Sequence, residues 1–274
     1  MPASGSWDVI CGADSGQIVL GVGFPAAGCR EAGFSDLAAR IGPEYRLLQA
    51  RALIIRPGQR LSVDAYVGPL IEDIRRDRGM VLAVLGYCVG SVYAAVVAEE
   101  ISRWQPPPKA IMFDPQSVNN KFLCLQFRNE IDGLSALLSD GEIERASKVA
   151  TEISQSATGD IADIATEIIE SYLEVITPAF ERAGLGDARS DKFAVAFASY
   201  ISWLSVTDQI DPSLAWKRST VIASSAYADL PDRAYLADGD HGITGQVIPF
   251  DVGHAELLRS DSVAQAVLGL LGSR

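Results

Sequence analysis

The stretch MVLAVLGYCVGSVYAAVVAEE, residues 80–100, decides the fold of this chain. Residues 80–85 form a short apolar run, which predicts a buried strand, and residues 91–104 have a helical pattern. Between them, residues 86–90 read Gly-Tyr-Cys-Val-Gly, with Cys88 at the centre. Because the two glycines leave room for a sharp strand-to-helix turn, the pattern predicts that Cys88 is held at the turn in a strained backbone conformation.

Similar apolar runs, rich in β-branched residues, recur along the chain and predict further buried strands. They cover residues 17–23, 52–55, 110–113, 220–223 and 246–250. Helical patterns fall between several of these runs and at the end of the chain, at residues 34–41, 67–76 and 255–271. This alternation predicts an α/β fold with a mainly parallel sheet covered by helices on both faces.

The alternation stops between Ser117 and Ser213, where about four helices follow one another without a convincing strand. The strongest of these helices covers residues 161–180, where apolar residues recur at spacings of three and four and predict one buried stripe. We therefore expect a core built from residues 1–116 and 214–274 and a helical lid insertion at residues 117–213.

Composition limits the classes of partner. The chain has 274 residues and a formal net charge of -12 at pH 7, whereas nucleic-acid binding needs clustered Lys and Arg. No apolar run approaches the roughly 20 residues that span a bilayer, and the first eight residues lack the order of a signal peptide. We therefore expect a cytoplasmic protein with small-molecule or protein partners, without nucleic acid or membrane.

The chain offers few groups for acid–base or metal chemistry. Its cysteines lie far apart, with no Cys-x-x-Cys pair, so no metal site is expected: Cys11, Cys29, Cys88 and Cys124. There are two histidines, and His254 lies between the last predicted strand and the last predicted helix. His254 is therefore the candidate base for Cys88, whereas His241 lies in a polar loop and is assigned no role.

Two aspartates are candidates for the group that orients His254. Asp114 directly follows the predicted strand at 110–113, whereas Asp229 lies several residues beyond the strand at 220–223. Asp114 is preferred, because its side chain should project from the carboxyl edge of the sheet.

Two backbone N–H groups are candidates for binding an oxyanion. Val89 follows Cys88 at the start of a predicted helix, where backbone N–H groups favour negative charge. Ala26, with Ala27 as the second choice, lies in the loop at residues 23–28, whose small residues let the backbone approach a bound carbonyl.

Four motifs together resemble the thioesterase domains of polyketide and nonribosomal peptide biosynthesis, which are α/β hydrolases. They are Gly-Phe-Pro-Ala-Ala-Gly at 23–28, Gly-Tyr-Cys-Val-Gly at 86–90, Phe-Asp-Pro at 113–115 and Gly-His at 253–254. The departure is Cys88 in place of the usual Ser. The position of Asp114 matches the releasing members of the family, whereas stand-alone editing members place the acid nearer Asp229.

The resemblance implies a function as well as a fold. An acyl or peptidyl group would pass from the phosphopantetheine thioester of a carrier protein to Cys88, with His254 and Asp114 completing a triad. Release would follow by cyclisation, transfer or hydrolysis, and the enzyme would need no cofactor of its own. Pocket-lining residues would be Tyr87, beside the nucleophile, and Tyr172, Phe197 and Trp203 of the lid, although core packing explains the last three equally well.

Two other interpretations remain open. The Gly-Tyr-Cys-Val-Gly segment is also similar to the turn of dienelactone hydrolases, which use a Cys, Asp, His triad. Those enzymes are smaller and lack a long helical insertion, so residues 117–213 count against them. The second alternative is a non-catalytic carrier-protein or ligand-binding module that kept the fold, because a fold alone never proves activity.

Overall fold

The computed structural model describes residues 5–12, 15–24, 31–77, 79–155, 159–229 and 245–272. The chain divides into two compact units. The first comprises Met1–Ala52, Val63–Ser117 and Ile210–Arg274, and the second comprises Leu53–Ser62 and Val118–Gln209.

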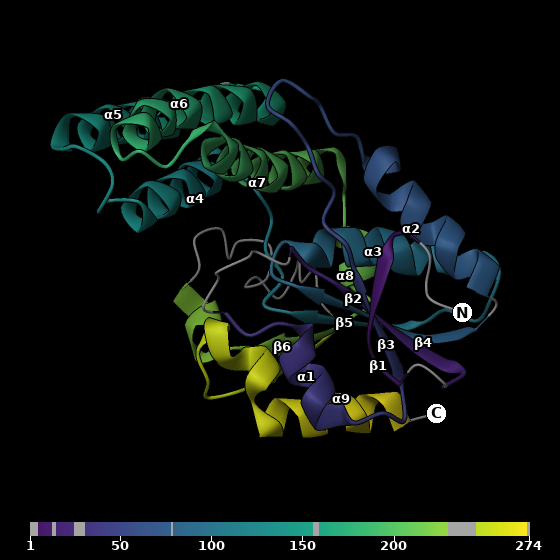
Figure 1. Cartoon of the computed structure of the whole chain (residues 1–274). Coiled ribbons are helices and arrows are strands. Elements are labelled where there is room, and N and C mark those ends of the chain that lie inside the picture. The colour runs from purple at the N-terminus through teal and green to yellow at the C-terminus, as the bar shows by residue number, and fades with distance from the viewer. Residues whose placement is uncertain are drawn as a thin grey trace. The chain divides into compact units, whose positions relative to one another are not determined.

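The first unit is built on a sheet with the strand order β1-β3-β2-β4-β5-β6-β7 (Figure 1). β1 pairs antiparallel with β3, and every other pair of neighbours is parallel. The strands are β1 (Trp7–Cys11), β2 (Gln17–Val22), β3 (Arg46–Ala50), β4 (Met80–Tyr87), β5 (Lys109–Phe113), β6 (Thr220–Ala223) and β7 (Gln246–Pro249). The predicted mainly parallel sheet is therefore confirmed.

Helices cover both faces of this sheet (Figure 1). On one face lie α1 (Phe34–Ile41) and α9 (Asp261–Gly272), and on the other lie α2 (Val63–Asp77), α3 (Gly90–Ile101) and α8 (Ser213–Trp216). Successive side chains of a strand point to opposite faces, so β4 contributes to both layers. Ala83 and Leu85 join the core cluster with α1 and α9, whereas Gly86 lies against Ala94 of α3.

The strand predictions differ from the structure in three places. The predicted strand at 52–55 is wrong: these residues form neither strand nor helix, and β3 ends just before them. Of these residues Ile55 is buried and Ile54 is exposed, and the Ile55 backbone N–H donates to Ser199 Oγ at 2.9 Å within the second unit. β1 and β3 were not predicted, and β1 is a short edge strand with exposed residues at Asp8 and Val9.

The second unit contains four long helices. They are α4 (Asn120–Gly133), α5 (Asp140–Gln155), α6 (Ile161–Arg182) and α7 (Asp187–Val206). The predicted helix at 161–180 is confirmed by α6, and its stripe is buried at Ile164, Ile168, Tyr172 and Ile176. Among the described residues, every helix is too short or too polar to cross a membrane.

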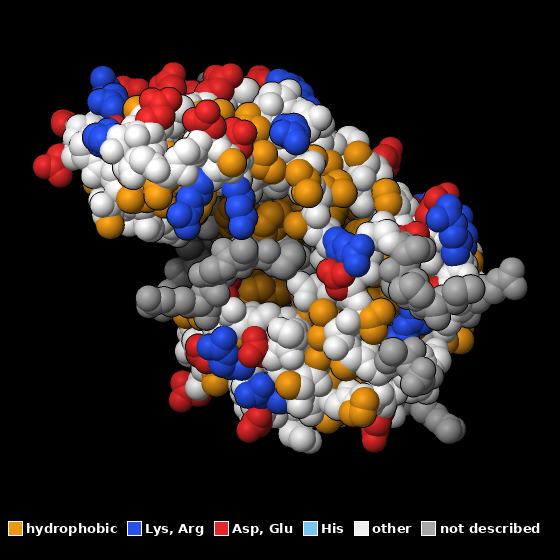
Figure 2. Space-filling model, in the orientation of Figure 1, with side chains coloured by type: hydrophobic (Ala, Val, Ile, Leu, Met, Phe, Trp, Pro, Cys, Tyr) orange, Lys and Arg blue, Asp and Glu red, His pale blue; other side chains and the backbone are white. Residues whose placement is uncertain are grey.

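Acidic and basic side chains are interspersed on the face drawn in Figure 2. Within the second unit, Arg60 lies 2.8 Å from Asp163, and Arg182 lies 2.7 Å from Glu142. The first of these pairs is exposed and contributes about 0–1 kcal/mol. Glu142 is buried, and the hydrogen bonds from Arg182 and Ser139 lower its pKa to about 2.

Candidate active site

Cys88 lies in a sharp turn between β4 and α3. Its φ is +51°, a left-handed conformation that costs a side-chain-bearing residue about 1–3 kcal/mol. Neighbouring backbone groups hold it there: the Cys88 N–H donates to Phe113 O at 2.9 Å, and the Ser91 N–H donates to Cys88 O at 3.1 Å. The strained turn predicted from the sequence is present.

The two glycines of the turn are required by close packing. A Cβ on Gly86 would lie 2.4 Å from the Ser91 Cα, and one on Gly90 would lie 2.2 Å from the Val22 carbonyl oxygen. Both contacts involve backbone atoms, so no side-chain rotation relieves them. These glycines let α3 approach β2 and β4 closely, which places Cys88 at the carboxyl edge of the sheet.

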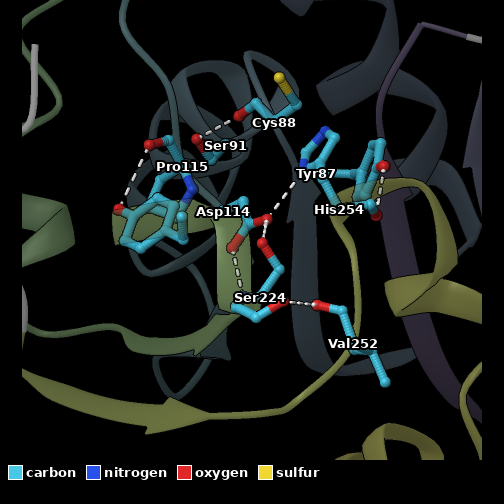
Figure 3. A network of polar contacts seen from close by, with 10 residues as sticks. Tyr87, Cys88, Ser91, Asp114, Pro115, Ser224, Val252 and His254 are labelled. Atoms are coloured by element: carbon cyan, nitrogen blue, oxygen red, sulfur yellow. Dashed lines mark hydrogen bonds and ion pairs between the residues drawn. The ribbon is translucent and has the colours of Figure 1, made fainter. Parts of the chain in front are cut away.

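Asp114 follows β5 directly and is completely buried, with φ of +44°. Its Oδ1 accepts from the Ser224 backbone N–H at 2.8 Å, and its Oδ2 accepts from the Ser224 hydroxyl at 2.5 Å. The same Oδ2 lies 2.7 Å from His254 Nδ1. The carboxylate therefore has both oxygens bonded, and one edge of the imidazole is fixed against it (Figure 3).

His254 begins the short 3-10 helix η4 (His254–Arg259), and its side chain is 24% exposed. Burial lowers the pKa of His254, but hydrogen bonds to Asp114 and Cys88, together with the charges of both groups, raise it to about 10. The site therefore favours an imidazolium that lies between Asp114 and Cys88. Figure 3 shows Cys88, Asp114 and His254 gathered in one place, although they come from separate segments.

Tyr87, the last residue of β4, lies against His254. Its hydroxyl donates to the His254 carbonyl oxygen at 3.0 Å, and the two rings are stacked with centroids 4.8 Å apart and planes 20° apart. The sequence predicted Tyr87 as a substrate-binding residue only, and this contact with the candidate base was missed.

The remaining predicted residues fall in different places. The Val89 backbone N–H makes no hydrogen bond within the described part of the chain. Ala26 and His241 lie outside the described residues, and the side chain of Asp229 is not described. Of the two candidate acids, Asp114 contacts His254.

The three aromatic residues predicted for the lid are buried in the second unit. Tyr172 and Phe197 have ring centroids 4.0 Å apart, and the Tyr172 hydroxyl donates to Glu130 Oε1 at 3.3 Å. Trp203 is 3% exposed. Their contacts fit the core-packing interpretation, and a role in lining an acyl pocket stays a prediction.

Ser224 was not found from the sequence. Its one local signal is its position directly after β6, at the same sheet edge as Asp114. Among the described residues, His, Cys, Asp and Glu form no cluster of three or more that could hold a metal ion.

Replacing Ser224 with alanine is expected to lower the free energy of unfolding by about 1.5–3 kcal/mol, because it removes a hydroxyl donor from a buried carboxylate. Chemical denaturation measures the change. Ser225→Ala is the matched control, since the neighbouring Ser225 is exposed and its hydroxyl donates to the Val252 carbonyl and not to Asp114. Equal losses in the two variants would contradict a specific role for Ser224, and Ser224→Thr should restore most of the stability.

The chain is similar in structure to several solved proteins. The NocB thioesterase domain from the nocardicin cluster matches with a TM-score of 0.53 and 14% identity, over 98% of this chain and 99% of that one. The enol-lactonase from Burkholderia xenovorans LB400 matches with a TM-score of 0.53 and 12% identity, over 97% and 96%. A four-domain nonribosomal peptide synthetase bound to AMP and glycine matches with a TM-score of 0.57 and 11% identity, over 98% and 20%.

No protein-family model matches the sequence, and no curated protein matches it. At identities of 11–14%, the structural likeness shows the fold alone. The mainly parallel sheet, the helices on both of its faces and the structural neighbours agree: the chain has the α/β-hydrolase fold.

Proposed function

We propose that this chain is a thioesterase-type acyl-processing enzyme of polyketide or nonribosomal peptide biosynthesis. It takes an acyl or peptidyl group from a carrier-protein thioester onto Cys88 and releases it by cyclisation, transfer or hydrolysis. Cys88 is the nucleophile, His254 the general acid and base, and Asp114 the group that orients His254. The Val89 and Ala26 backbone N–H groups bind the oxyanion.

One observation carries this proposal. A cysteine with φ of +51° at a strand-to-helix turn shares a site with a histidine whose Nδ1 lies 2.7 Å from a fully buried aspartate. A nucleophile, a base and an orienting acid in this relation are the components of covalent acyl transfer. Backbone strain of this kind costs energy and clusters at functional sites, so it is not expected at a cysteine with a purely structural role.

The first half of the reaction transfers the acyl group to the enzyme. The Cys88 thiolate attacks the thioester carbonyl carbon, and the carbonyl electron pair moves onto the oxygen to give a tetrahedral oxyanion. Backbone N–H groups directed at this oxygen stabilise it more than they stabilise the ground-state carbonyl. The bond to the carrier sulfur then breaks, and the imidazolium of His254 gives its proton to the departing thiolate.

The second half releases the acyl group. The neutral His254 removes a proton from water, an amine or a hydroxyl, which attacks the acyl-Cys88 carbonyl, and the bond to Cys88 Sγ breaks. Because acyl-Cys88 is itself a thioester, its formation from a carrier thioester is nearly isoenergetic. The acyl group therefore stays activated on Cys88. An amine captures it, or a ring closes, more readily than from an acyl-enzyme of lower energy.

The test is product analysis with matched substrates. The protein is incubated with one set of acyl groups as carrier-protein thioesters and as simple thioesters, and with a second set of lactones, including a dienelactone. Turnover of thioesters to acid, amide or ring product supports the proposal. Turnover of lactones alone would replace it with the lactone-hydrolase alternative, and no turnover of either set would favour a binding module.

The charge state of His254 gives a prediction about pH. We expect His254 to stay protonated from pH 6.5 past pH 9, because Asp114 and Cys88 raise its pKa to about 10. In Cys88→Ala the hydrogen bond and negative charge of one partner are lost, so the pKa of His254 should fall. Nitrogen-15 NMR titration of histidine-labelled protein measures both values. A His254 that titrates near pH 6.5 in both proteins would contradict the charged pair.

A further inference from the structure

Tyr87 contacts His254 in two places that are chemically independent. Its hydroxyl donates to the His254 backbone carbonyl at 3.0 Å, which holds the main chain. Its ring stacks on the imidazole, with centroids 4.8 Å apart and an interplanar angle of 20°, which holds the side chain. The two residues are 167 positions apart in sequence, so the contact joins the end of β4 to the start of η4.

The two contacts with Tyr87 involve parts of His254 that the bond to Asp114 leaves unrestrained. Asp114 fixes the imidazole at Nδ1, and the Tyr87 ring covers one face, so rotation about either side-chain torsion breaks a contact. Nε2 remains at the opposite edge of the ring, away from Asp114. Tyr87 and Cys88 are adjacent in the chain, so the residue that stacks on the imidazole directly precedes the candidate nucleophile.

The stacking partner also suits a charged imidazole. An aromatic ring carries negative charge on its face and attracts a cation placed over it. An apolar side chain of similar size would cover His254 from water but would not attract its charge.

Several of the other charged side chains around η4 form ion pairs. Besides Asp114 and Cys88, the elements against η4 carry Asp36 and Arg40 on α1, Asp261 on α9, Asp229 on the 3-10 helix η2 (Ser225–Asp229), and Glu256 and Arg259 on η4 itself. Arg259 lies 3.1 Å from Glu256 and 3.9 Å from Asp36, and Arg40 lies 2.9 Å from Asp261. Asp251, in the segment before η4, is exposed. Among these neighbours, Tyr87 is the residue whose ring stacks on the imidazole of His254.

We propose that Tyr87 is a positioning residue that clamps His254, through a ring stack that stabilises the imidazolium and a hydroxyl bond that anchors its backbone. Tyr87 serves catalysis only if His254 is the base of the proposed function. Its hold on the imidazole is measurable without any substrate.

The experiment is a nitrogen-15 titration of histidine-labelled protein. Only two histidines are present, and a His241→Asn variant leaves the His254 signal alone. Tyr87→Leu keeps apolar cover but removes the ring, and is expected to lower the pKa of His254 by about 0.4 to 1.5. Tyr87→Phe keeps the ring and is expected to leave the pKa within about 0.3 of the wild-type value.

Two results would overturn the clamp: an unchanged or raised pKa in Tyr87→Leu, or an equal fall in Tyr87→Phe and Tyr87→Leu. Thermal unfolding checks that each variant is folded. If the leucine variant is not folded, Tyr87→Met replaces it, because methionine also fills the space without a ring.

The hydroxyl bond has its own measurement. Tyr87→Phe is expected to lower kcat by about 3- to 10-fold with KM unchanged, the effect of one lost hydrogen bond on the position of a base. A raised KM with unchanged kcat would instead make Tyr87 a substrate contact and contradict the anchoring role. If the wild-type protein turns over no thioester, the proposed function has failed, while the titration still decides whether the ring stack exists.

Discussion

Under the proposed function, thioester turnover is expected to fall by at least about 10⁴-fold in the Cys88→Ala variant, because the proposed nucleophile is removed. The fold should be unaffected, since alanine is smaller than cysteine and the turn is held by backbone hydrogen bonds. Cys88→Ser keeps a hydroxyl at the same position and should retain measurable turnover. Steady-state kinetics with a carrier-protein thioester measures these changes.

Cys11→Ala is the matched control for this prediction. Cys11 and Cys88 are both half-buried free thiols of the first unit, but the Cys11 thiol faces the carbonyls of Gly42 and Tyr45 instead of a base. Its loss should leave kcat and KM unchanged. Comparable activity losses in both variants would indicate a general effect of thiol removal and would argue against Cys88 as nucleophile.

Asp114→Asn has the second largest expected effect, a fall in kcat of about 10³- to 10⁴-fold. Asparagine can still accept the Ser224 N–H bond, so the loop should keep its shape. Its amide group would then face His254 Nδ1 as a donor, which favours the opposite tautomer and removes the charge that stabilises the imidazolium. Single-turnover kinetics separates the acylation step from product release.

Glu142→Gln provides the control for a buried carboxylate. Asp114 and Glu142 are the two buried acidic residues of the described chain, but Glu142 binds Arg182 in the second unit. The glutamine variant should lose stability through this ion pair and keep the rate of Cys88 acylation. An Asp114→Asn variant with the same activity as Glu142→Gln would remove Asp114 from the triad.

The parts of the site that sequence predicts are those encoded in short segments. The apolar run of β4, the two glycines and the pattern of α3 lie within a stretch of about 20 residues, and each constrains its neighbours directly. Asp114 is signalled by its position directly after β5. Helix α6 shows its period of three and four because one stripe of it is buried.

The parts that the sequence does not reveal depend on distant contacts. Ser224 reaches Asp114 across 110 positions, and the Tyr87 hydroxyl reaches His254 across 167. No local pattern encodes such a pairing. The wrong strand prediction at 52–55 is a related case, because the Ile55 backbone N–H bonds the distant Ser199 side chain and not a neighbouring strand.

The most direct test of the central claim is intact-protein mass spectrometry after brief incubation with a panel of acyl thioesters. We predict that the wild-type protein gains the mass of one acyl group, that Cys11→Ala gains the same mass, and that Cys88→Ala gains none. Peptide mapping should place the adduct on Cys88. An adduct that persists in Cys88→Ala, or turnover of thioesters without any adduct that depends on Cys88, would contradict the acyl-enzyme mechanism.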